Sequence, residues 1–101
     1  MSFRIERWDE PGSPKAEILR KRLEREGYSV SENTDQPGMH YEPHSHESDQ
    51  THWILSGEAE FAVENETYTL RAGDRDYLPA NTEHSAAVVG SEPVRYLVGV
   101  K

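Results

Sequence analysis

The sequence of 101 residues contains no cysteine. This excludes disulfide bonds and thiolate metal sites, so any bound metal must be held by nitrogen and oxygen ligands. No apolar stretch approaches the length needed to span a membrane, and the first 25 residues contain no apolar run like that of a signal peptide. We therefore expect a cytoplasmic protein that does not bind membranes.

Basic and apolar residues are both scarce. There are 11 Lys and Arg residues against 19 Asp and Glu residues, which gives a formal net charge of −8. This negative field repels phosphate backbones, so nucleic-acid binding is not expected. Apolar residues make up only 34% of the chain. A domain this small and polar needs added stability, which a bound metal or a partner subunit would supply.

Residues 1–27 are predicted to form an N-terminal arm and a helix. Residues 14–26 are good helix formers, with Ser13 placed to cap the first turn and Gly27 suited to the left-handed position after the last. Apolar side chains recur at helical spacing and would pack on the rest of the protein: Ala16, Leu19 and Leu23.

In residues 28–101 the apolar side chains recur at every second position, a spacing that is typical of strands. The short segments are bounded by turn residues and comprise 38–46, 50–56, 59–64, 67–71, 75–79, 84–90 and 93–100. Many short strands at close spacing predict an antiparallel sandwich or barrel. The expected protein is mostly β, with one N-terminal helix packed on a barrel in a single domain.

His44 and His46 are the first candidate metal ligands. Positions i and i+2 of a strand point to the same face, so the two imidazoles would lie side by side. Neutral imidazole is the commonest side-chain ligand for transition metals. Gln50 follows closely, and His84 is a fourth candidate much later in the chain.

These residues fall in a pattern that resembles the two sequence motifs of the cupin superfamily. The first motif is matched in spacing by Gly38, His44, His46, Gln50 and Gly57, with glutamine where the family usually has glutamate. The second motif is matched by Gly73, Pro79 and His84, with two departures. Asn81 replaces a glycine, which is mild because asparagine tolerates positive φ, and Val88 replaces an asparagine.

The resemblance implies a small jelly-roll barrel with a metal inside it. His44, His46 and His84 would bind the metal through ring nitrogens, and Gln50 would bind through its carbonyl oxygen or lie just behind the ligands. No organic cofactor is implied. Glutamine leaves the site more positive than glutamate would, which favours an anionic ligand. A nitrogen-rich ligand set suits zinc, nickel, iron, cobalt or copper, and manganese is disfavoured without a carboxylate.

Three further residues have open roles. His52 shares the face of Gln50, so it is either another ligand or a proton-transfer group lining the cavity. Glu42 is a second candidate base. His40 is spaced from His44 and His46 by an even number of residues, so it would share their face in an unbroken strand. Pro43 would interrupt that strand, so His40 is either a cavity-wall or a surface residue.

Residues 75–77 and Trp53 are harder to place. Arg75 and Asp76 form either a surface ion pair or a polar group in the cavity. Trp53 and Tyr77 either face outward, toward solvent or a partner, or pack in the core beneath the helix.

Two classes of function follow from the resemblance. The protein is either an enzyme, performing metal-dependent isomerase, lyase, cyclase or dioxygenase chemistry on a small molecule, or a non-catalytic module that binds or senses such a molecule. Ligation by both Gln50 and His52 would favour Lewis-acid chemistry over dioxygenation, because few positions on the metal would remain open. Small cupins commonly pair through their outer sheets and terminal strands, and exposed sheet edges need covering. We therefore expect a homodimer.

Overall fold

The computed structural model describes residues 2–101 and contains one helix and nine strands within them. The elements, in chain order, are β1 (Arg4–Glu6), α1 (Ala16–Arg25), β2 (Ser29–Asp35), β3 (His40–His44), β4 (Gln50–Ser56), β5 (Glu58–Val63), β6 (Glu66–Arg71), β7 (Arg75–Tyr77), β8 (His84–Val88) and β9 (Val94–Val100). The predicted mostly β fold is confirmed. No helix in residues 2–101 is both long enough and apolar enough to cross a membrane.

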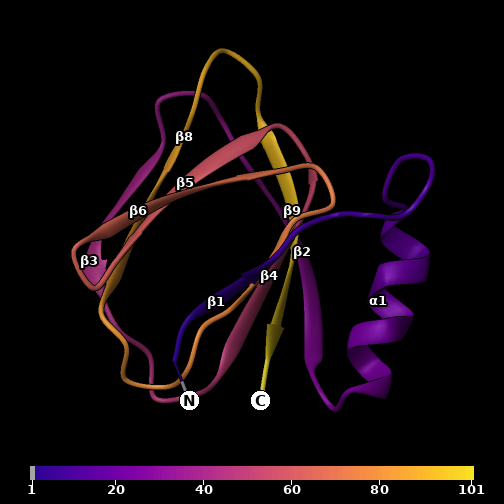
Figure 1. Cartoon of the computed structure of the whole chain (residues 1–101), viewed down its shortest axis with the longest axis horizontal. Helices are drawn as coiled ribbons and strands as arrows, with labels where there is room; N and C mark the ends of the chain where they lie inside the picture. The colour runs from indigo at the N-terminus through magenta and orange to yellow at the C-terminus, as the bar shows by residue number, and fades with distance from the viewer. Residues whose placement is uncertain (1) are drawn as a thin grey trace.

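The strands form two antiparallel sheets that face each other as a sandwich (Figure 1). One sheet has the order β1-β7-β4-β9-β2, and the other has the order β3-β8-β5-β6. The apolar residues between the sheets form the larger core cluster, made of Ile54, Ala59, Phe61, Val63, Leu70, Val94 and Tyr96. This inner space also contains the site described below.

The helix covers the outer face of the five-stranded sheet, on the right of Figure 1. Its apolar stripe is as predicted, because Leu19 and Leu23 are fully buried. They pack against Trp53 and two leucines of the sheet. Trp53 is therefore a core residue beneath the helix, and its indole N–H donates to the carbonyl of Gly73 at 2.8 Å.

The ends of the helix show one wrong prediction and one correct one. Ser13 does not cap the helix: the N-cap position is Lys15, which makes no side-chain hydrogen bond there. Because the helix begins at Ala16, the hydroxyl of Ser13 falls too far upstream to reach the first free N–H groups. Gly27 has a φ of 97°, so it occupies the left-handed position expected after the last turn.

The strand β2 is longer than the sequence suggests. Its residues pair with β9 from Ser29 through Asp35, whereas the apolar alternation covers only Tyr28 and Val30. It is an edge strand, so most of its side chains are exposed and polar. Hydropathy therefore gives no signal for its second half, where two residues of the cavity wall, Asn33 and Asp35, are located.

Candidate metal centre

Strand pairing brings two of the predicted histidines together. His44, at the end of β3, lies directly opposite His84, at the start of β8. His46 lies two residues beyond the end of β3, and its carbonyl accepts the backbone N–H of Asn81 at 2.6 Å. Asn81 has a φ of 60°, as expected for its place in the second motif. This contact joins the two motifs, so His46 and His84 share one site although they are far apart in the chain.

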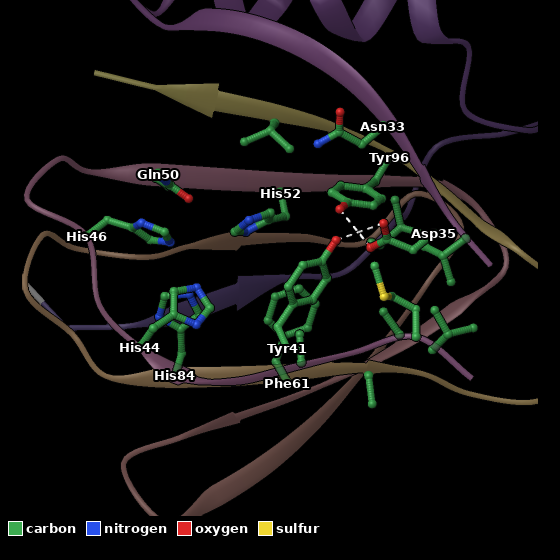
Figure 2. A pocket seen from close by; sticks show the side chains of 18 residues that line it. Asn33, Asp35, Tyr41, His44, His46, Gln50, His52, Phe61, His84 and Tyr96 are labelled. Carbon is green, nitrogen blue, oxygen red and sulfur yellow. Dashed lines mark hydrogen bonds between the residues drawn. The ribbon is translucent and has the colours of Figure 1, made fainter. Parts of the chain in front are cut away.

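The three histidines form a compact cluster at one end of the cavity (Figure 2). Each can offer a ring nitrogen such that all three atoms lie within 4.8 Å of one another. The ring centroids are 4.4 Å apart for His44 and His84, 4.7 Å for His44 and His46, and 5.1 Å for His46 and His84. Three imidazoles this close are suited to binding one shared cation.

Backbone carbonyls orient two of the rings. The Nδ1 of His44 lies 2.7 Å from the carbonyl oxygen of Glu42, and the Nδ1 of His84 lies 2.9 Å from that of Thr82. A carbonyl can only accept, so Nδ1 carries the proton in both rings and the lone pair belongs to Nε2. This second contact is typical of metal-binding histidines, because it fixes both the tautomer and the direction of the ring.

Burial favours the neutral, ligand-competent form of two of these histidines. Burial is the largest cause that lowers the pKa of His46, with the charges of His44 and His52 adding to it. Burial also lowers the pKa of His84, which is only 4% exposed, despite the opposing hydrogen bond to Thr82. A neutral imidazole has a lone pair available for a metal, whereas an imidazolium does not.

Gln50 and His52 line the same cavity from β4. Figure 2 shows Gln50 near the histidine cluster and His52 between that cluster and Tyr96. The Nδ1 of His52 is 2.9 Å from Oδ2 of Asp76, and Oδ1 of the same carboxylate accepts the backbone N–H of His52 at 2.8 Å. Nε2 is therefore the nitrogen of His52 left for the cavity. Burial lowers the pKa of His52, but the charge and hydrogen bond of Asp76 outweigh it and the net pKa is raised.

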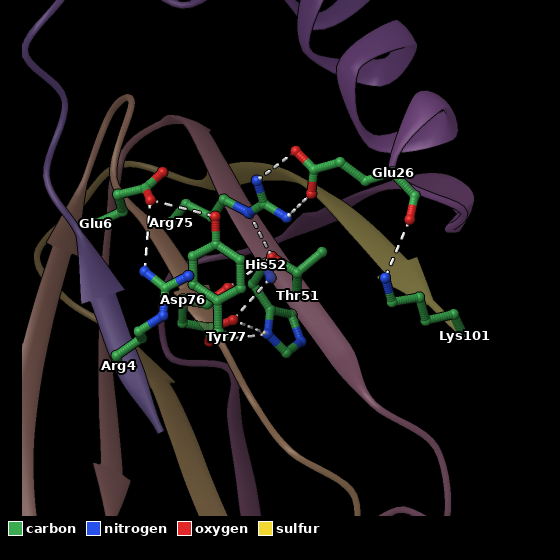
Figure 3. A network of polar contacts seen from close by, with 9 residues as sticks. All are labelled: Arg4, Glu6, Glu26, Thr51, His52, Arg75, Asp76, Tyr77 and Lys101. Atoms are coloured by element: carbon green, nitrogen blue, oxygen red, sulfur yellow. Dashed lines mark hydrogen bonds and ion pairs between the residues drawn. The ribbon is translucent and has the colours of Figure 1, made fainter. Parts of the chain in front are cut away.

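Arg75 and Asp76 point to opposite sides of β7, so they form neither a surface ion pair nor a joint group in the cavity (Figure 3). Asp76 is fully buried and faces His52. Arg75 is 2% exposed and faces the helix side, where it forms two hydrogen bonds to Glu26, the shorter at 2.7 Å, and donates to Thr51 at 2.8 Å. The guanidinium also lies 4.2 Å from the ring centre of Tyr77. Alternation along the strand explains the separation.

Glu42 does not lie in the cavity. Its side chain is 83% exposed and lies 3.3 Å from the ring of His40, which is itself 67% exposed. The pairing of β3 with β8 shifts between Tyr41 and His44, so a bulge interrupts the alternation there. The bulge puts Tyr41 on the cavity wall and His40 outside it. In a regular strand His40, and not Tyr41, would share the face of His44. Glu42 and His40 are therefore surface residues outside the cavity.

The cavity has a volume of about 210 Å³. Sequence reasoning missed three residues at the end away from the histidine cluster: Asp35, Tyr41 and Tyr96 (Figure 2). The Tyr41 hydroxyl donates to one oxygen of Asp35 at 2.9 Å, and the Tyr96 hydroxyl donates to the other at 2.8 Å. Burial is the largest cause that raises the pKa of both tyrosines, and Asp35 raises it further, so both remain phenols.

Comparison with known proteins agrees with this arrangement. The family model described as "Cupin domain" matches residues 32–100. This chain is a cupin. The match runs from the middle of β2 to the end of β9 and includes all three clustered histidines. The family resemblance noted in the two motifs is thereby confirmed. No curated protein matches the chain.

Several solved structures resemble this cupin. DMSP lyase DddQ from Ruegeria pomeroyi DSS-3 is 27% identical with a TM-score of 0.67, over 73% of this chain and 38% of that one. Oxalate decarboxylase from Bacillus subtilis, described with Mn(II) centres, is 28% identical with a TM-score of 0.66, over 73% of this chain and 21% of that one. A cupin-2 domain containing protein from Shewanella frigidimarina NCIMB 400 is 19% identical with a TM-score of 0.61, over 70% of this chain and 67% of that one.

The chain therefore spans less than half the length of the two enzymes that it resembles. The residues that it does have are well suited to a metal. Three imidazoles converge, two of them with their Nδ1 atoms already held by carbonyl oxygens, and no carboxylate or thiolate joins the cluster among residues 2–101. Such an all-nitrogen set is neutral and suits a divalent transition metal.

Proposed function

We propose that this cupin binds one divalent transition metal through His44, His46 and His84, with Gln50 as a further oxygen ligand or neighbour. The convergence of three ring nitrogens within 4.8 Å carries this proposal. Zinc, nickel, iron, cobalt and copper suit the nitrogen-rich set. Manganese joins these candidates despite the sequence-based expectation, because the similar oxalate decarboxylase is described with Mn(II) centres.

We further propose that the cavity holds a small anion against this metal. The absence of a carboxylate from the cluster leaves a divalent site with its full positive charge, which attracts an anionic ligand. The volume of about 210 Å³ lies below the range of roughly 300–1,000 Å³ that suits drug-sized molecules. The ligand is therefore expected to have only a few heavy atoms.

The favoured activity is Lewis-acid chemistry of the lyase or decarboxylase type. Support comes from the two similar enzymes, which are a lyase and a decarboxylase. A bound divalent metal would supply polarisation of the anion. The protein would supply a proton-transfer group in His52, whose Nδ1 is held by Asp76 and whose Nε2 is left for the cavity. Apolar side chains such as Ile54 and Phe61 would exclude water from the ligand.

A non-catalytic binding module is the second candidate. Tyr41 and Met39 line the cavity yet are 38% and 44% exposed, so the cavity opens to solvent at that side. An open mouth suits reversible binding, whereas chemistry generally benefits from a closed site. Incubation of the metal-loaded protein with oxalate and with DMSP separates the two classes, because an enzyme of the decarboxylase type releases carbon dioxide from oxalate, an enzyme of the lyase type cleaves DMSP, and a binding module returns both unchanged.

Metal content is the direct test of the proposed centre. Protein purified without a nickel column should contain about one equivalent of a transition metal by elemental analysis. His84→Ala should lose it, because the cluster then has two imidazoles. His40→Ala is the matched control and should retain it, since His40 lies outside the cavity. Wild-type protein that takes up no stoichiometric metal, even when metals are supplied, would refute the proposal.

Three sequence-based expectations stay proposals. We propose a homodimer, which light scattering would refute by showing only monomer, and a cytoplasmic location. We also propose that residues 1–27 and 28–101 fold as one domain. Support for the last comes from the pairing of β1 with β7 and from the contact between Glu26 and Arg75.

A further inference from the structure

The end of the cavity away from the histidine cluster carries a carboxylate held by two phenols. Asp35 accepts a hydrogen bond from Tyr41 at 2.9 Å on one oxygen and from Tyr96 at 2.8 Å on the other. Figure 2 shows these residues gathered on the opposite side of His52 from His44, His46 and His84. All of them line the same cavity, so a ligand could touch both ends.

The groups at this end accept hydrogen bonds but offer few donors. A carboxylate accepts only, and it has about four lone-pair directions, of which the two phenols use two. Each phenol already donates its one O–H hydrogen bond to Asp35, so its oxygen can only accept a further bond. Asn33 is the one nearby side chain with an amide donor that also lines the cavity. This end is thus built to receive a group that donates.

The charge at this end is not in direct contact with a cationic side chain in the described chain, although it helps the charge of Asp76 to raise the pKa of His52. No Lys or Arg is found among the residues that line the cavity within the described chain, and Asp35 forms no ion pair there. A partly buried carboxylate is costly unless a cation or several donors compensate it. The aromatic rings of Tyr41, Tyr96 and Phe61 that line this space can also attract a cation.

We propose that Asp35, held in place by the hydroxyl groups of Tyr41 and Tyr96, binds the ammonium group of a ligand whose anionic end faces the histidine cluster. The ligand class is therefore a small amino acid in which an amine and a carboxylate stand at opposite ends. This inference rests on the proposed metal centre for the anionic end. The inference adds a binding site for the cationic end of the ligand, and the residues of that site are different from the proposed metal ligands.

A purely structural role for the same three residues makes a different prediction. Asp35 and Tyr96 belong to the five-stranded sheet, and Tyr41 belongs to the four-stranded sheet, so the Tyr41 hydrogen bond also ties the sheets together. If this tie were the whole role, substitutions would change stability and leave ligand preference untouched. The test must therefore read the difference in affinity between ligands with and without an amine.

The experiment compares matched acids by calorimetric titration of the metal-loaded protein. Glycine, β-alanine and γ-aminobutyrate are measured against acetate, propionate and butyrate. In at least one pair the amino acid should bind about tenfold more tightly than the plain acid. Asp35→Asn should abolish this difference while leaving binding of the plain acid unchanged within about twofold. Glu42→Gln is the control outside the cavity and should retain the difference.

Two further measurements keep the result interpretable. Tyr41→Phe removes the tie between the sheets but keeps the carboxylate, so it should lower stability and preserve the preference for the amine. If Asp35→Asn does not fold, Asp35→Ser takes its place and should abolish the preference. The trimethylammonium form of the preferred amino acid has no N–H donor and should bind more weakly than the amine.

The outcomes separate this inference from the proposed function. If the plain acids bind and no amino acid binds more tightly, or if Asp35→Asn keeps the preference, the ammonium site is refuted and the metal centre stands. Loss of the preference in Tyr41→Phe, or equally tight binding of the trimethylammonium form, also refutes it as described. If the metal-loaded protein binds none of these acids, the ammonium site and the proposed anion site both fail, whereas the metal centre is still decided by its metal content.

Discussion

The two faces of the five-stranded sheet use polar residues for different purposes. On the outer face, Arg75 bonds to Glu26 and Thr51, and every one of these contacts ends on another protein group (Figure 3). On the inner face, Asp76 holds only one ring nitrogen of His52 and leaves the other ring nitrogen for the cavity. Neighbouring residues of one short strand thus serve stability on one side and a ligand site on the other. The following predictions test that division.

The largest effect is expected from Arg75→Met. The guanidinium is buried against aromatic rings and anchors Glu26 and Thr51, so its loss should reduce the free energy of unfolding by about 3 kcal/mol. Metal content of the folded variant should not change. Urea denaturation and elemental analysis measure the two quantities. Arg95→Met is the control: its ion pair with Glu32 is exposed and should contribute less than about 1 kcal/mol. A similar loss for both variants would contradict the account.

Removal of the metal is the matching test of the inner face. When the concentration of free metal is about a hundred times its dissociation constant, metal binding adds about 2.7 kcal/mol to the stability of the folded state. A chelator should therefore lower the melting temperature of the wild type and of His40→Ala. It should leave His84→Ala unchanged, because that variant has no complete cluster to lose. Equal shifts in all three proteins would show that the chelated metal binds elsewhere.

A smaller effect is expected from Asp76→Asn. The amide oxygen can still accept the backbone N–H of His52, but the amide nitrogen would face the Nδ1 proton. The ring must then change tautomer or turn, at a cost of about 1–2 kcal/mol measured by thermal denaturation. Metal content should persist, while release of carbon dioxide from oxalate, if the wild type shows it, should fall. Unchanged stability would mean that the carboxylate does not orient His52.

The smallest effect concerns acid stability of the outer face. The hydrogen bond from Arg75 is the largest cause that holds the pKa of Glu26 below its ordinary value of 4.5. A lowered pKa stabilises the fold above pH 4.5, and this contribution is lost as the pH falls through the lowered value. The stability of wild type and Glu26→Gln should therefore converge below pH 4.5. The side chain is 43% exposed, so the difference will be small. Parallel curves at all pH values would refute this contribution.

The sequence contains enough information to predict the histidine cluster but not the whole cavity. The spacing of His44, His46 and His84 within two family motifs predicts convergence without any knowledge of the intervening loops. The positive φ of Asn81 likewise follows from its place in the second motif. These predictions depend on local patterns that a single sequence displays.

The remaining residues depend on tertiary structure. Asp35 lies on an edge strand with no apolar alternation, so nothing marks it as a cavity residue. Tyr41 enters the cavity, and His40 leaves it, because of a bulge that hydropathy does not reveal. Arg75 and Asp76 look like an ion pair in sequence. Only the folded structure shows that Arg75 bonds to Glu26 on the helix side of β7 and that Asp76 bonds to His52 on the other side.

Anomalous scattering from crystals of the as-isolated protein tests the central claim most directly. The account predicts one metal peak between the sheets, within bonding distance of a ring nitrogen of each of His44, His46 and His84, which is about 2.0–2.1 Å for zinc. A peak bound by other residues, or no peak in crystals supplied with excess metal, would contradict it.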